Sequence, residues 1–144
     1  MLMEIIKYKN TDRRYAQTLQ LRDVILRQPI GLSIYDEDLS YESENFFFGM
    51  VENDELLGTV NYFAKSDNVA QVCAFAVRAD KQKQGIGSQL IIALLIELQA
   101  RNFKKCIVSA RPEAVKFYEK FGFTVDAPVK TKQDGMSMMM ELNF

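Results

Sequence analysis

The sequence predicts an α/β protein with a mixed, mostly antiparallel central sheet of six to seven strands and about four flanking helices. Three consecutive strand patterns separated by short polar turns predict an antiparallel meander over residues 46–77. A strand, a long helix and a second strand then occupy residues 69–109, and this connection implies a parallel pair with a right-handed crossover. Further strand patterns at both ends of the chain complete the predicted sheet.

The N-terminal part of the chain is predicted as one strand followed by one helix. Residues 4–8 form a short apolar run that is typical of a strand. Asn10 or Thr11 is expected to cap the following helix, because both side chains can accept a hydrogen bond from its first turn. This helix is expected to end near Leu26, shortly before Pro29.

The remaining elements follow from hydrophobic spacing and turn residues. The meander strands are expected at 46–51, 56–63 and 69–77. The next helix has the clearest pattern in the chain, with an i, i+3, i+4, i+7 apolar face made by Ile91, Leu94, Leu95 and Leu98. A short strand at 106–109, a helix beginning at Pro112 and strands at 123–130 and 136–142 complete the order, the last two joined near Asp134-Gly135.

Composition excludes several classes of function. The 144 residues fit one domain, predicted to span 1–144, and the net charge of -1 argues against a nucleic-acid partner. The chain has no histidine, which excludes histidine triads and histidine general bases, and no metal-ligand spacing surrounds Cys73 or Cys106, so no metal is expected. Without a signal-peptide pattern or a long apolar run, no membrane partner is expected and the predicted location is cytoplasmic.

The turn between the third meander strand and the long helix is the most informative segment. Gly85 and Gly87 open the helix, and Lys81 and Lys83 lie just before them. Glycines allow a close backbone approach, and the unpaired N–H groups of a helix N-terminus favour a phosphate. The spacing fits neither a Walker loop nor a dinucleotide fingerprint. By itself it is compatible with an anion site or with an ordinary tight turn.

Two blocks of the sequence resemble one known family. Gln82-Lys83-Gln84-Gly85-Ile86-Gly87 resembles the Gln/Arg-x-x-Gly-x-Gly/Ala signature of the GNAT acetyltransferase superfamily. Residues 110–123, with Phe117-Tyr118 and Gly122-Phe123, are similar to its Ala-x-x-Phe-Tyr-x-x-x-Gly-Phe segment. The blocks stand in the family's order and separation, and the 27–31 run and the Asp134-Gly135 tail resemble its small ElaA-like bacterial branch.

The resemblance implies a site for acetyl-CoA, the acyl donor, in a sheet that splays between its fourth and fifth strands. It implies that the pantetheine arm pairs with the fourth strand at Phe75, Ala76 and Val77. It places Tyr118 near the thioester sulfur as a proton donor, although a tyrosine at this spacing is also typical of a packed core aromatic. The pyrophosphate is expected on N–H groups of Gln82, Lys83, Gln84, Gly85, Ile86, Gly87 and Ser88.

The acceptor half of the site is less defined. Residues 69–77 contain no acid and the chain has no histidine, so a carboxylate, a water chain or the amine itself must manage the amine proton. The candidate carboxylates by position are the acids of 36–44, which are Asp36, Glu37, Asp38, Glu42 and Glu44. Their other interpretation is a solvated acidic face. Relatives of the small bacterial branch carry a histidine near the last hairpin, whereas this chain has Met136-Ser137-Met138, which puts a contribution of the tail in doubt.

Two functions stay open at this point. The first is an acetyl-CoA-dependent N-acetyltransferase that transfers an acetyl group to a primary amine of a small molecule or peptide by direct attack on the thioester. The second is an acetyl-CoA-binding protein with little or no turnover, which the missing acid in 69–77 favours and Tyr118 opposes. The methionines of 136–140 indicate adaptable packing or a homodimer contact.

Overall fold

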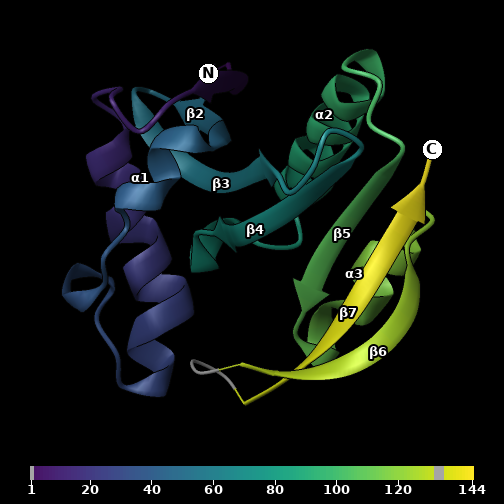
Figure 1. Ribbon diagram of the computed structural model, residues 1–144. Coiled ribbons are helices and arrows are strands. Elements are labelled where there is room, and N and C mark those ends of the chain that lie inside the picture. The colour runs from purple at the N-terminus through teal and green to yellow at the C-terminus, as the bar shows by residue number, and fades with distance from the viewer. Residues whose placement is uncertain (1, 132–134) are drawn as a thin grey trace.

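The computed structural model describes residues 2–131 and 135–144, which form a seven-stranded sheet in the order β1-β2-β3-β4-β5-β7-β6 (Figure 1). Neighbouring strands are antiparallel except for β4 and β5, which are parallel. The predicted mixed, mostly antiparallel sheet is therefore confirmed. The strands are β1 Glu4–Tyr8, β2 Phe46–Glu52, β3 Glu55–Ala64, β4 Val69–Val77, β5 Lys105–Ala110, β6 Thr124–Thr131 and β7 Gly135–Asn143.

The described helices cover both faces of this sheet. α1 spans Tyr15–Arg22 and continues as a π-helix over Asp23–Arg27, α2 spans Ile86–Ala100, and α3 spans Val115–Glu119 after a 3-10 turn at Pro112–Ala114. The main core lies between the sheet, α2 and α3, and a smaller one lies beneath α1. Adjacent β3 residues alternate between the two cores, Leu56 in the smaller and Leu57 in the main one, as strand geometry requires.

The start of α1 differs from the sequence prediction, as does the helix expected from Pro112, which begins with the 3-10 turn before α3. Neither Asn10 nor Thr11 caps it, because the α-helix begins at Tyr15 and its N-cap residue, Arg14, makes no side-chain cap. A turn comes first, in which the Asp12 carboxylate accepts a hydrogen bond from the Arg14 N–H at 2.8 Å. The aspartate satisfies a backbone donor locally, so the chain turns before it enters the helix.

The sheet splays between β4 and β5, as expected. The two strands pair only from Val69 to Val72 and from Lys105 to Val108. Beyond this point β4 continues to Val77 and β5 to Ala110 without pairing to each other, and Figure 1 shows the two strands diverging. The splay leaves one edge of β4 open between the two halves of the sheet.

β7 is an interior strand, paired with β5 on one side and β6 on the other. Met140, in the middle of β7, is fully buried in the main core, which agrees with the packing interpretation of this methionine. The predicted turn at Asp134-Gly135 falls partly outside the described residues. In the part of the chain that the structure describes, no helix is both long and apolar enough to cross a membrane.

Candidate active site

A cavity of about 730 Å³ lies in the splay between β4 and β5. The bulged half of β4 forms one wall, and the end of β5 with α3 forms the opposite wall. The π-helix after α1 lines the cavity through Ile25, Leu26 and Arg27, and the start of α2 lines it through Gly87. The cavity thus contacts residues of both sequence blocks.

A β-bulge gives the β4 wall its open backbone. Asn61 of β3 pairs with Cys73, but the next pair up the ladder joins Thr59 to Ala76. Two β4 residues, Ala74 and Phe75, therefore lie opposite a single β3 residue and have no register partner on β3 or β5. Both line the cavity, so this stretch of β4 faces the cavity outside the regular ladder of either neighbouring strand.

The bulge also reverses the alternation of side chains along β4. Ala76 packs in the smaller core beneath α1, whereas Phe75 packs on the other face against α3. The Phe75 ring meets the edge of Phe117 at a centroid distance of 5.5 Å and that of Tyr118 at 6.5 Å. The inserted residue thereby brings the β4 wall and the Phe117-Tyr118 pair together around one space.

Tyr118 is largely buried in an aromatic cluster, with 5% of its surface exposed, yet it lines the cavity. Its ring lies 5.3 Å from that of Phe117 and 5.5 Å from that of Phe123. Burial raises the pKa of the Tyr118 hydroxyl well above its usual range, so the phenol is protonated at neutral pH. A protonated hydroxyl at this wall can donate a hydrogen bond to a ligand in the cavity.

The glycine turn leaves the N-terminus of α2 free for a ligand. Gly85 is the N-cap residue in the left-handed conformation, with a φ of 85°, and no side chain caps the helix. The first N–H groups of α2 therefore have no partner within the helix. Gln82 closes the preceding loop, since its side-chain amide donates to the carbonyl oxygen of Val77 at 3.0 Å. These features fit an anion site, with Lys81 and Lys83 nearby in the chain.

The predicted cofactor residues divide into three groups in the structure. Phe75, Ala76, Val77, Gln82 and Gly87 line the cavity together with Tyr118. Lys83, Gln84 and Gly85 lie on the exposed turn beside it, and Ser88 is half-buried in the first turn of α2. Ile86 is buried in the main core, so only its backbone is available to a ligand.

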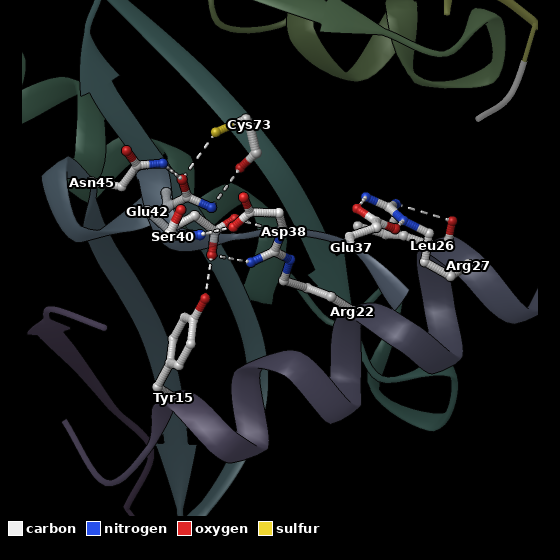
Figure 2. Close-up of polar contacts among 11 residues, drawn as sticks. Tyr15, Arg22, Leu26, Arg27, Glu37, Asp38, Ser40, Glu42, Asn45 and Cys73 are labelled. Carbon is white, nitrogen blue, oxygen red and sulfur yellow. Dashed lines mark hydrogen bonds and ion pairs between the residues drawn. The ribbon is translucent and has the colours of Figure 1, made fainter. Parts of the chain in front are cut away.

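Of the five acids considered as a base, Glu42 alone lines the cavity. Its carboxylate accepts two hydrogen bonds from Arg22, at 2.9 and 2.8 Å, and a third from the Tyr15 hydroxyl at 2.6 Å (Figure 2). Burial acts to lower the pKa of the Arg22 guanidinium, but the hydrogen bonds and charge of Glu42 outweigh it and hold that pKa above its usual value. This carboxylate is thus engaged by a fixed cation.

The other four acids lie outside the cavity lining. Glu37 forms an ion pair with Arg27, whose Nε lies 2.5 Å from a Glu37 oxygen (Figure 2). Asp36, Asp38 and Glu44 are exposed, which agrees with the interpretation of a solvated acidic face. Arg22 and Arg27 also line the cavity, but neither was predicted, since an arginine on a helix carries no local sign that it will face a cavity.

The comparisons with known proteins agree with this arrangement. The family model for the acetyltransferase (GNAT) domain matches residues 28–144. The chain belongs to the GNAT acetyltransferase family. The GNAT membership that the two sequence blocks predicted is therefore confirmed, and the chain is assigned to the N-acetyltransferases at the level of its family.

Solved structures share the fold over nearly the full length of the chain. A proposed N-acetyltransferase from Lactobacillus plantarum is 21% identical, with 99% of each chain covered and a TM-score of 0.84. Escherichia coli ElaA is 19% identical, with 97% of this chain and 99% of that chain covered and a TM-score of 0.78. The PaiA N-acetyltransferase from Thermoplasma acidophilum, solved with coenzyme A, is 18% identical over the whole of both chains, with a TM-score of 0.74. At these identities the likeness concerns the fold.

Proposed function

We propose that this GNAT acetyltransferase is a single-domain, cytoplasmic enzyme that transfers an acetyl group from acetyl-CoA to a primary amine of a small molecule or peptide. The observation that carries the proposal is that one cavity joins the open edge of β4 to Tyr118. A thioester placed between them would meet backbone donors on one side and a phenol on the other. The same cavity extends to the uncapped start of α2.

Each part of acetyl-CoA has a suitable partner in this arrangement. The extended pantetheine arm suits the unpaired edge of β4 at Phe75, Ala76 and Val77, because an added strand recovers the hydrogen bonds that the splay leaves open. The pyrophosphate suits the turn from Gln82 to Ser88, where N–H groups and the helix dipole favour negative charge. The acceptor amine then enters from the side of the π-helix, which the donor leaves free.

The reaction is a direct substitution at the thioester carbon. The amine nitrogen forms the new C–N bond, the C–S bond breaks with its electron pair on sulfur, and the amine proton passes to water. Backbone N–H groups of the β4 bulge stabilise the negative charge that develops on the carbonyl oxygen. Tyr118 donates a hydrogen bond to the departing sulfur. Because its pKa is raised far above the ordinary thiol value of about 8.5, its proton stays mainly on the phenol.

The test is a panel of primary amines assayed for release of the coenzyme A thiol, with wild type beside Tyr118→Phe. We expect turnover of at least one amine and a loss of about 100-fold in kcat for Tyr118→Phe, in the range for removing one hydrogen-bond donor to a developing negative charge. Binding of coenzyme A should be unchanged, because the ring is retained. Tyr8→Phe is the matched control, since Tyr8 is equally buried at 5% exposure but its hydroxyl bonds to Thr18 and Thr59 away from the cavity.

The second candidate function is acetyl-CoA binding without turnover. It is favoured by the absence of an acid from Val69–Val77 and by the engagement of Glu42 with Arg22 and Tyr15. Tight binding of coenzyme A with no thiol release from any amine, from pH 6 to pH 9, would support this candidate. Equal kcat values for wild type and Tyr118→Phe would remove the role of the phenol while leaving acetyl transfer in place.

A further inference from the structure

A buried pair of asparagines lies directly behind the bulge of β4. Asn61 of β3 has no exposed surface, and Asn45, the residue before β2, has 1%. The Asn45 amide donates to Asn61 Oδ1 at 2.8 Å, and the Cys73 thiol donates to the same oxygen at 2.9 Å (Figure 2). The Asn61 amide nitrogen in turn donates to the backbone carbonyl of Cys73 at 3.3 Å. The Asn61 side chain is thus held at both of its polar atoms.

This contact involves the last regular pair before the bulge. Asn61 and Cys73 are register partners, and the next β4 residue, Ala74, has a φ of 53°. A left-handed conformation at a residue other than glycine is strained and persists only where its surroundings hold it. The bond from Asn61 to the Cys73 carbonyl acts on the peptide unit that leads into this conformation.

The direction of one N–H group follows from that bond. The Cys73 carbonyl and the Ala74 N–H belong to one planar trans peptide, so the two groups point in opposite directions. Since the carbonyl is directed to Asn61 on β3, the Ala74 N–H is directed away from Asn61 and β3. Ala74 has no register partner on either neighbouring strand and lines the cavity.

We infer that Asn61, oriented by Asn45, is a positioning residue for acetyl transfer, which holds the Cys73–Ala74 peptide so that its N–H faces the acyl group in the cavity. The inference rests on the proposed function, because it assigns the bulge N–H to the thioester carbonyl. Ordinary packing does not require this arrangement. Two primary amides in the core cost free energy unless they are bonded, and a pair of apolar side chains would fill the same space without that cost.

The test compares Asn61→Asp with wild type. Aspartate has nearly the same shape but, when ionised, cannot donate to the Cys73 carbonyl, so the peptide loses its restraint. We expect kcat for acetyl transfer to fall about 10-fold, with the KM for acetyl-CoA and the Kd for coenzyme A within about twofold of wild type, since the turn at α2 is untouched. Asn45→Leu removes the bond that orients Asn61 without altering β3 or β4, and should give a smaller loss of kcat in the same pattern.

Thr59→Val is the matched control. Thr59 is a fully buried polar residue two positions from Asn61 on the same strand, and its hydroxyl bonds to Tyr8. The kcat of the Thr59→Val variant should equal that of wild type even if the melting temperature of the variant is lower. A kcat loss in Thr59→Val equal to that in Asn61→Asp, or unchanged kcat in a folded Asn61→Asp, would overturn the inference.

A second measurement separates this inference from the proposed function. In a ¹H–¹⁵N spectrum of wild type, the Ala74 amide should shift more with acetyl-CoA than with coenzyme A, because only the former offers a carbonyl oxygen. Asn61→Asp, or Asn45→Leu if the former does not fold, should remove that difference. If no amine gives thiol release but the difference is present in wild type and lost in the variant, the positioning role stands while turnover fails. An equal difference in wild type and variant would overturn the positioning role.

Discussion

Replacing Glu42 with glutamine tests the buried ion pair that fixes the segment before β2. The side chains of Glu42 and Arg22 are each 2% exposed, and two hydrogen bonds of 2.8–2.9 Å join them. Glutamine keeps the volume but removes the charge, and its amide nitrogen faces an Arg22 N–H where a carboxylate oxygen accepted before. The Arg22 guanidinium then stays buried without a counter-charge.

The expected loss of stability is large for one substitution. Removing one partner of a buried ion pair costs about 3–5 kcal/mol, because the remaining charge has lost both water and its partner. The free energy of unfolding of a domain of this size is about 5–15 kcal/mol, so this substitution should remove a substantial part of it. At about 3 °C per kcal/mol, Glu42→Gln should lower the melting temperature by about 10–15 °C.

The assay is thermal unfolding followed by circular dichroism at pH 7, with Glu44→Gln as control. Glu44 lies in the same 3-10 segment, Ser40–Glu44, but is exposed, so the same change should alter stability by less than about 0.5 kcal/mol. The double variant Arg22→Met/Glu42→Leu should recover most of the loss, since it leaves no unpaired charge. Equal melting temperatures for Glu42→Gln and Glu44→Gln would refute this reasoning.

Two further predictions concern the turn and the buried thiols. Gly87→Ala should fold normally, because an added methyl would lie 3.6 Å from Phe75 and Phe117, in ordinary contact. The methyl narrows the cavity, so the affinity for coenzyme A measured by calorimetry should fall about 10-fold. Unchanged affinity would contradict this placement of the donor. Burial raises the pKa of both Cys73 and Cys106 to about 12 from 9.0. The unfolded chain therefore loses thiol protons first as pH rises, so this stabilisation is complete below pH 9 and is lost between pH 9 and about 12. In urea titrations over that pH range, a Cys73→Ala/Cys106→Ala variant should lose less free energy of unfolding than wild type. An equal loss in variant and wild type would show that the buried thiols do not cause the pH dependence.

Much of the fold could be predicted because its signals are local. The periodic face of Ile91, Leu94 and Leu98 predicts α2, and all three are buried in the main core. The bounds of β1 and β4 match the predicted strands, since short apolar runs between turns leave few alternatives. The start of α1 was misplaced because several polar residues in a row, from Asn10 to Asp12, offered equivalent caps.

The candidate site could be predicted only in part, because some of its residues come together from distant parts of the sequence. The glycine turn and Tyr118 lie in contiguous blocks, and several of their residues reach the cavity where the family resemblance expects it. The acids of 36–44 were noticed as a group, but nothing in their order distinguished buried Glu42 from exposed Glu44. Burial depends on what packs against a residue, and Arg22 stands 20 positions away in the sequence.

The sequence by itself determined the element order, the family and the position of the glycine turn, since each depends on residues close together along the chain. Tertiary structure decided the contacts around Glu42 and behind the β4 bulge. Glu42 meets Arg22, and Asn61 meets both Asn45 and Cys73, only after α1, the segment before β2, β3 and β4 have come together. The bulge at Ala74 also belongs to this second class, because its left-handed backbone is imposed by the register between two strands and leaves no mark on an alanine in the sequence.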